Sequence, residues 1–376
     1  MGQGIDMTVN RLPARTWNWL KMNESRLTDV KIEKACPVTP VVTGHGTTWE
    51  RVSAEKIQSE QTENGFAWKN LVTGMGPDMD RLAEEDEQAQ VDVITAEAGA
   101  DEDNMAGFDY ECQPGERYFN RLYLHAKENS VLNVTVLYRS AGAGEGLSAH
   151  QIKVCAEKNA VVRIYMAEIL DAGVTCLSDL GGVCEDNARV ELVKLELGAG
   201  KLYSGGEIDL KGKASNFTAG IGYTAKPGQH LDMNYTARHH GKKTESLMEV
   251  SGVVSENAFK IFRGTIDFIA GCAGSKGTES EDVLLLGEEL VNQTIPLILC
   301  AEEDVEGNHG ASIGKLDDQT LFYLASRGIP KEEAEKMLAR ARVDALNARI
   351  PVKSVRDTVE AYLGGGDEAD DEEEEK

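Results

Sequence analysis

The chain has 376 residues, of which 41% are hydrophobic, and it carries a formal net charge of −25 at pH 7. This length is sufficient to bury a sizeable core, and the acidic charge argues against binding to nucleic acid, which requires a basic surface. The chain contains no run of about 18 apolar residues, which a membrane span would need, and its first 20 residues lack the apolar core of a secretory signal. We therefore expect a cytoplasmic protein that binds neither nucleic acid nor membrane.

The N-terminal region, residues 1–117, mixes helical patterns with turns marked by proline and glycine. It contains all of the tryptophans of the chain, Trp17, Trp19, Trp49 and Trp68. We predict a mixed α/β region here.

The pattern changes over residues 118–316, where apolar and polar residues alternate as in β-strands. A turn-like element with a central asparagine recurs, and its first four copies are spaced by 30, 28 and 29 residues: Asn129, Asn159, Asn187 and Asn216, followed by Asn257. Asparagine tolerates the left-handed backbone conformation, which suits a corner between two strands. This period favours the stacked coils of a β-solenoid, and an antiparallel sandwich with regular hairpins is the alternative.

The C-terminal region, residues 317–363, has a helical pattern and predicts a helical domain. Asp317 or Asp318 is expected to cap a first helix that Gly328 ends, and Pro330 is expected to open a second helix. The last residues, 364–376, are acidic and almost without apolar side chains, so we predict a disordered tail.

Sequence motifs for common catalytic sites are absent. The chain contains no GxxxxGK[ST] loop, no GxSxG elbow, no HExxH pair and no EF-hand loop. Its seven cysteines are scattered without a CxxC pair, which argues against zinc-finger, ferredoxin and thioredoxin patterns. We expect no nucleotide bound by this chain and no enzymatic activity of its own.

The segment 294–330, TIPLILCAEEDVEGNHGASIGKLDDQTLFYLASRGIP, resembles the C-terminal signature of the SufB/SufD family of iron–sulfur cluster assembly scaffolds. Upstream, FRGTID at 262–267 and the spacing of His239, Thr244 and Ser246 are also similar to that family. The matching residues of the C-terminal signature are Asp304, Val305, His309, Gly310, Ala311, Gly314, Leu316, Asp317, Leu321, Phe322, Tyr323, Leu324, Ser326, Arg327, Gly328 and Ile329.

This resemblance implies a mainly β protein whose core is a right-handed parallel β-helix. It also implies pairing of two such cores, as a homodimer or as a heterodimer with another SufB- or SufD-like chain. Each chain of such a pair carries an ABC-type ATPase, similar to SufC, on its C-terminal helices. The implied function is assembly of a transient iron–sulfur cluster, with iron and sulfur donors and apo-protein acceptors as further partners.

The resemblance also suggests site residues. His309 matches the interface histidine of the family. Family members carry cysteines at the position of Gly307 and at that of Glu281 or its neighbours Ser280 and Asp282. Cys272 and Cys300 are the nearby thiols that are candidates to replace them, and Glu281 and Glu303 are candidate oxygen ligands. The expected surface for the ATPase comprises Leu321, Phe322, Leu324, Arg340 and Arg342.

Several readings remain open at this point. The chain is either a scaffold that pairs with itself or a SufD-like structural partner of a separate, cysteine-bearing chain. A β-solenoid that binds a partner without any metal is a third reading. A carbohydrate lyase or hydrolase is a fourth, since Glu302, Glu303 and Asp304 form an acidic cluster, but no sugar-binding aromatic platform accompanies it.

Overall fold

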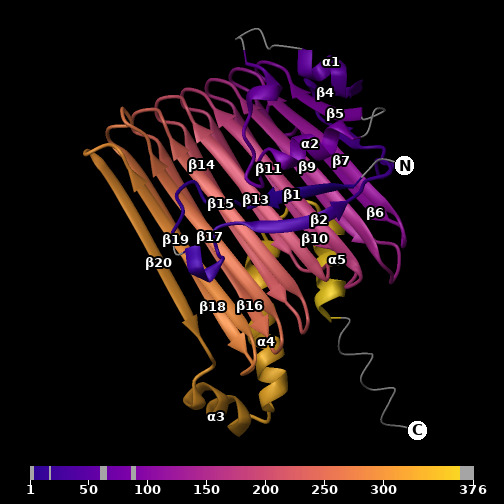
Figure 1. Cartoon of the computed structure of the whole chain (residues 1–376), viewed down its shortest axis with the longest axis vertical. Helices are drawn as coiled ribbons and strands as arrows, with labels where there is room; N and C mark the ends of the chain where they lie inside the picture. Colours follow the sequence, from indigo (N-terminus) through magenta and orange to yellow (C-terminus); the bar gives the residue numbers. More distant parts are fainter. Residues whose placement is uncertain (1–3, 17, 60–65, 86–89, 365–376) are drawn as a thin grey trace.

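The computed structural model describes residues 4–16, 18–59, 66–85 and 90–364. In this part of the chain, two nine-stranded sheets face each other across a shared core and form a β-solenoid of about eight turns (Figure 1). The predicted parallel β-helix is confirmed, and the antiparallel sandwich is wrong. Trp17 and residues 365–376 of the predicted acidic tail lie outside the described residues.

Each turn of the solenoid contributes one strand to each sheet. The first sheet, sheet I, contains β4 (Thr47–Ser53), β5 (Gln90–Ala96), β7 (Arg117–Ala126), β9 (Gly146–Ala156), β11 (Val174–Cys184), β13 (Lys201–Leu210), β15 (His230–His239), β17 (Phe259–Phe268) and β19 (Val291–Cys300). The second sheet, sheet II, contains β3 (Val41–Thr43), β6 (Met105–Cys112), β8 (Val131–Ser140), β10 (Val161–Ile169), β12 (Arg189–Glu196), β14 (Asn216–Ala225), β16 (Glu245–Ser255), β18 (Ser275–Leu286) and β20 (Val305–Gly314).

Neighbouring strands from β5 and β6 onward pair in parallel and in register, so the parallel ladder includes strands that lie before residue 118. β3 and β4 pair antiparallel with β6 and β5 and close the N-terminal end of the ladder. In a parallel pair, residues opposite each other point to the same face. The register therefore stacks the side chains of successive turns into columns.

The asparagine corners behave as the repeat predicts, with one exception. Asn129, Asn159 and Asn187 have φ between 55° and 60°, and their side chains form a ladder with hydrogen bonds of 2.8 and 3.2 Å. Asn216, in contrast, opens β14, and the left-handed residue of that turn is Ala214, with φ of 57°. The repeat thus identified the corner, but the position of the left-handed residue was wrong by two residues in this turn.

The N-terminal segment crosses the outer face of sheet I (Figure 1). It contains the antiparallel pair β1 (Ile5–Val9) and β2 (Ser25–Val30), and four short helices, η1 (Asn18–Leu20), α1 (Ala54–Ser59), η2 (Trp68–Asn70) and α2 (Asp78–Glu84). A buried ion pair anchors it: Arg263 of β17 contacts Asp232 of β15 at 2.5 Å and donates to the carbonyl of Met22 at 2.7 Å.

Three helices follow β20: α3 (Asp318–Ser326), α4 (Lys331–Asn347) and α5 (Lys353–Gly364). Asp317 caps α3 by accepting a hydrogen bond of 2.8 Å from the Thr320 amide, as predicted, and Gly328 has a φ of 85° after the helix. Helix α4 packs on β12, β14 and β16 of sheet II. Glycines of β14 permit this approach, because a Cβ at Gly220 would lie 2.8 Å from Leu346 of α4.

A histidine clamp fixes one corner near the C-terminal end of the solenoid. The ring of His239 is fully buried and contacts the hydroxyl of Thr244 at 2.7 Å and that of Ser246 at 2.9 Å. Thr244 in turn lies 2.7 Å from the hydroxyl of Ser275 in the next turn. The spacing shared with the SufB/SufD family therefore forms a structural link between successive turns.

This clamp predicts a pH dependence of stability. Burial, helped by His240, lowers the pKa of His239 from 6.5 to about 4. Between these values the unfolded chain binds more protons than the folded chain, so stability falls as the pH decreases through this window. Between pH 7 and pH 5 this histidine should account for a loss of roughly 2 kcal/mol in the free energy of unfolding.

His239→Asn keeps a polar side chain that does not titrate. Urea unfolding of both proteins at pH 7 and pH 5 should show that the stability advantage of the natural protein shrinks by about that amount at the lower pH. An equal advantage at both pH values would contradict the assignment.

Candidate functional site

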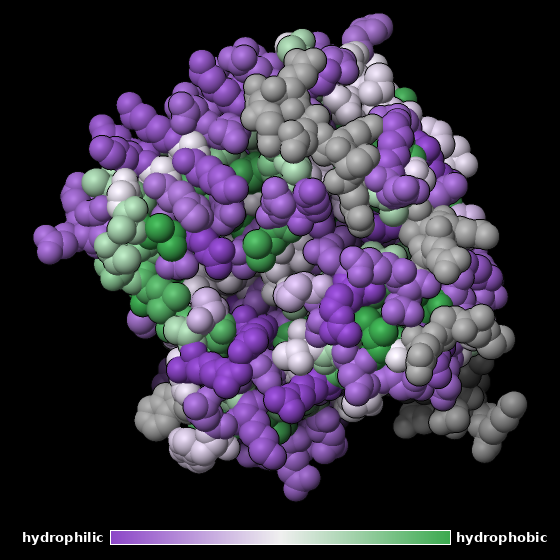
Figure 2. Space-filling view, turned by 45° about the horizontal axis from the view of Figure 1, so that its top comes forward, coloured by the Kyte–Doolittle hydropathy of each residue, from purple (hydrophilic) through white to green (hydrophobic). Residues whose placement is uncertain are grey.

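The C-terminal end of the solenoid is open. β19 and β20 are the last strands of their sheets, and among the described residues no strand pairs with their outer edges. Val291 and Ile313 on these strands are 42% and 46% exposed. Figure 2 shows apolar surface at the left edge of the molecule, the side on which Figure 1 draws these strands. Long exposed strand edges of this kind are sites for pairing with another chain.

His309 lies on β20 at this open end and is exposed. It stands opposite Glu279 of β18 in the parallel ladder, and Glu281 stands opposite Ala311, two residues further along. Glu279 and Glu281 are each 2% exposed and face the interior. The open end therefore combines one exposed imidazole with two buried carboxyl groups from the preceding turn.

The two carboxyl groups have different surroundings. Glu281 forms an ion pair with Lys260, accepts a hydrogen bond of 2.6 Å from Thr294 and one of 3.2 Å from Tyr223. Glu279 has one oxygen that is buried and has no hydrogen-bond partner among the described residues. Burial raises the pKa of Glu279 to about 7, and the Glu281 carboxylate adds to this rise.

The remaining predicted site residues lie at a corner of the solenoid rather than beside His309. Cys272 is in the turn between β17 and β18, is buried, and has a pKa raised mainly by that burial. Cys300 ends β19, is exposed, and lies 3.0 Å from the carbonyl of Glu302. Glu303 follows and is also exposed. His309 is four residues beyond the start of β20, which places it roughly 13 Å along the strand from this corner.

The residues expected to face an ATPase fall into two groups. Phe322 of α3 is 77% exposed, whereas Leu321 and Leu324 are half-buried. Arg340 pairs with Asp344 within α4, and Arg342 lies 3.6 Å from Asp282 of β18, so Arg342 links α4 to sheet II. Phe322 is therefore the member of this set that is most available to a partner.

The sequence analysis missed a polar network inside the middle turns. His150 lies 2.8 Å from both Glu168 and Ser178, and these three side chains are buried. Lys194 lies 3.4 Å from Glu168 and 3.1 Å from Glu196, so one ammonium group serves two carboxylates. Burial alone would raise the pKa of Glu168, but Lys194 and His150 outweigh it and lower that pKa to about 2.

Cys176 adjoins this network, and one ligand atom each from His150, Glu168 and Cys176 lie within 4.8 Å of one another. Such a set has the residue types of a metal site. However, the Lys194 ammonium already supplies the positive charge beside Glu168. We therefore interpret the network as a buried charge cluster in which Lys194 is the counter-charge, while His150 Nδ1 and one oxygen each of Glu168 and Glu196 have no hydrogen-bond partner among the described residues.

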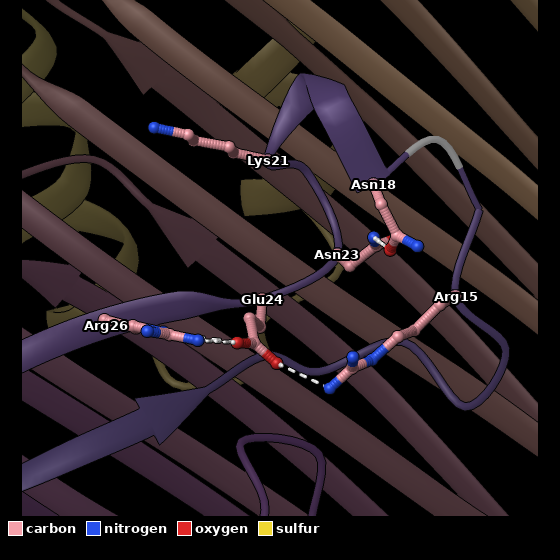
Figure 3. A pocket seen from close by; sticks show the side chains of 6 residues that line it. All are labelled: Arg15, Asn18, Lys21, Asn23, Glu24 and Arg26. Carbon is pink, nitrogen blue, oxygen red and sulfur yellow. Dashed lines mark hydrogen bonds and ion pairs between the residues drawn. The ribbon is translucent and has the colours of Figure 1, made fainter.

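A surface pocket of about 460 Å³ lies elsewhere, on the N-terminal segment. Figure 3 shows Glu24 between Arg15 and Arg26, with Lys21 directed away from them. The Arg26 guanidinium donates to Glu24 at 2.9 Å and is the main cause of the lowered pKa of that carboxyl. None of the predicted site residues lines this pocket.

The family model described as "SUF system FeS cluster assembly, SufBD core domain" matches residues 110–342, which is more than half of the chain. The chain belongs to this SufBD family. The match contains nearly all of the parallel solenoid, including His309 and both carboxyl groups of the open end.

Individual relatives within the SufBD family agree with this assignment. The chain is 28% identical to the iron–sulfur cluster assembly protein SufD of Bacillus subtilis (strain 168) over 244 residues, which cover 63% of this chain and 55% of SufD. It is 29% identical to SufB of the same organism over 173 residues, which cover 46% of this chain and 37% of SufB. An iron–sulfur cluster assembly SufBD family protein of Staphylococcus epidermidis is 26% identical over 238 residues, 62% of this chain and 51% of that protein.

The chain thus spans between about a third and just over half of the length of these SufBD relatives. The expectation of family membership is confirmed. In the described residues, no helix has both the length and the apolar composition needed to cross a membrane.

The buried charge cluster gives a prediction about stability. Lys194→Met removes the ammonium group and leaves Glu168 and Glu196 buried without a counter-charge, which should lower the free energy of unfolding by about 3–5 kcal/mol at pH 7. Lys201→Met, at an exposed position of β13, is the matched control and should change stability by less than about 0.5 kcal/mol. Equal stabilities of the two variants in urea unfolding would contradict the role of Lys194.

Proposed function

We propose that this chain is a scaffold component of a SUF-type iron–sulfur cluster assembly complex. In this proposal it is not an enzyme itself. It pairs through the open end of its solenoid with a second SufB- or SufD-like chain, and its C-terminal helices bind an ABC-type ATPase similar to SufC. Iron and sulfide are the substrates, and apo-proteins receive the cluster that forms at the seam between the two chains.

The main support for the proposed pairing is the contrast between the two ends of the solenoid. At the N-terminal end, β3 and β4 run antiparallel to the ladder, and helix α1 packs against β4. At the C-terminal end, β19 and β20 are ten residues long each and run parallel to their neighbours up to the edge. Unpaired backbone groups of such edges favour extension of both sheets by a partner.

His309 supports cluster assembly at this seam. It is the exposed residue that matches the interface histidine of the family resemblance, and a neutral imidazole is a good ligand for iron. Cys272 and Cys300 at the solenoid corner are candidate thiolates, and Glu303 is a candidate oxygen ligand there. Their distance along the strand from His309 favours a role for these residues in delivery of iron or sulfur rather than in one shared site.

The ATPase contact is supported by helix α3. This helix packs against α4 and exposes two aromatic residues, Phe322 and Tyr323, at 77% and 56%. Exposed aromatic side chains are enriched at the centres of protein interfaces. Charge pairs involving Arg340 lie on the adjoining helix and are suited to the polar rim of such a contact.

A second candidate is a SufD-like structural partner of a separate chain that supplies the thiols. Glu281 favours this reading, because it occupies the position at which the resemblance places a cysteine, and it is engaged by Lys260. A metal-free binding module is the remaining candidate. These alternatives differ in whether the chain pairs with itself and in whether it supports cluster formation without a cysteine-bearing partner.

Pairing and assembly are tested together by Ile313→Lys. This change places an ammonium group at the open end, where pairing would bury it without a counter-charge, so self-association or association with a SufB-like chain should weaken at least tenfold. Light scattering after size-exclusion chromatography measures the pairing. Anaerobic reconstitution with iron, sulfide and the ATPase should show lower cluster absorption in the same variant.

The control for this experiment is Val41→Lys, which adds the same charge to an exposed position on β3 at the opposite end. It should pair and assemble as the natural protein does. A natural protein that neither pairs nor gives cluster absorption, alone or with a SufB-like chain, would refute the proposed function.

The ATPase contact is tested by Phe322→Ala. Loss of the exposed ring should reduce capture of a SufC-like ATPase by about tenfold or more, because truncation of central aromatic residues typically costs more than 1–2 kcal/mol. Val41→Ala removes a similarly exposed apolar side chain far from α3 and should leave capture unchanged. Unaltered binding of Phe322→Ala in a pull-down with purified ATPase would exclude α3 from the contact.

A further inference from the structure

Glu279 is a buried carboxyl group that the structure leaves without a partner. It lies on the inner face of β18, is 2% exposed, and one of its oxygens has no hydrogen-bond partner in the described part of the chain. Gly264 of the facing strand β17 provides its space, because a Cβ at this glycine would lie 3.0 Å from the Glu279 carboxyl carbon. A buried carboxyl without a partner is costly unless something binds it.

The neighbouring carboxyl does not share this property. Glu281 is held by Lys260, Thr294 and Tyr223, so its charge is neutralised and its oxygens are occupied. The ammonium of Lys260 is thereby committed to Glu281. Glu279 is left as the carboxyl of the open end that has free ligand capacity.

The parallel register brings His309 next to Glu279. The two residues are direct partners in the ladder between β18 and β20, so their Cα atoms are about 4.8 Å apart and their side chains point to the same face. His309 is exposed at the last turn, and within the described residues no side chain hydrogen-bonds to it. An accessible imidazole therefore stands directly outside a carboxyl group with an unsatisfied oxygen.

We propose that Glu279 and His309 together bind a divalent first-row metal ion such as Fe²⁺ at the open end of the solenoid. This inference rests on the proposed function, and it assigns the oxygen ligand to Glu279 rather than to Glu281. One nitrogen and one carboxylate donor suit such an ion, and water or groups from the paired chain complete its coordination. The ion supplies the counter-charge that the Glu279 carboxyl lacks within the described residues.

Co²⁺ is a suitable probe, because its visible absorption reports coordination by the protein. The natural full-length chain is titrated with Co²⁺ under anaerobic conditions, with excess Mg²⁺ present to fill weak sites on the acidic surface. Glu279→Gln and His309→Ala should each raise the Co²⁺ dissociation constant at least tenfold. Glu249→Gln, an exposed carboxyl on the outer side of the adjacent strand β16, should leave it within twofold.

Circular dichroism and thermal unfolding establish that each variant is folded. If Glu279→Gln is folded and binds Co²⁺ as tightly as the natural protein, the assignment is overturned. The same follows if the natural protein binds no Co²⁺ in the presence of the excess Mg²⁺. Because this titration uses neither sulfide nor ATPase, it separates the two proposals: Co²⁺ binding lost in Glu279→Gln supports the site even if cluster reconstitution fails.

Discussion

The in-register parallel ladder is the constraint on which the rest of this structure depends. Each residue stands opposite its equivalent in the turns before and after. Side chains of successive turns therefore stack in columns, with about 4.8 Å between one turn and the next. Apolar columns form the shared core, and a column of asparagines forms the corner ladder. The columns also determine which polar groups meet inside the solenoid, since a charged residue at an inward position can reach only its own turn and the adjacent ones.

Within this ladder, a few buried ammonium groups neutralise buried carboxylates of neighbouring turns. Lys194 serves both Glu168 and Glu196 in the middle turns, and Lys260 serves Glu281 near the open end. Removing a charge from water is expensive unless a partner neutralises it, so each ammonium position determines which carboxyl groups can stay ionised. Glu279 is a buried carboxyl that these pairs leave over, and it lies in the last covered turn, where the solenoid stops and solvent or another chain begins.

The two ends of the solenoid are built differently. The N-terminal end is closed by antiparallel strands, and the N-terminal segment is tied to the ladder through Arg263 and Asp232. The C-terminal end keeps ten-residue edges, apolar side chains and His309 exposed, and the helices that follow it fold back onto sheet II. In the function that we propose, the open end presents ligands at a seam with a second chain, and the helices beside it bind the ATPase.

Local sequence was sufficient for a large part of this description. The Asn129, Asn159 and Asn187 corners, the Asp317 cap and the stop at Gly328 follow from backbone preferences of single residues, and the C-terminal signature was enough to recognise the family. The left-handed conformation of Ala214 was not predicted, because the register of the turn rather than the residue type decides which position takes that conformation. In principle, charged residues in phase with apolar ones, such as Lys194 on β12 and Glu279 on β18, mark inward-facing charges.

The partners of these inward-facing charged residues could not be predicted from the sequence. Lys194 meets Glu168, and Glu279 stands beside His309, only because separate turns stack in one particular register. The same stacking separates Cys272 and Cys300 at the corner from His309 on the strand, although Cys300 is only nine residues before His309 in the sequence. Local preference thus determined the elements and the family, whereas the tertiary register decided which titratable groups are neighbours, since a shift of one residue would turn each of them to the opposite face.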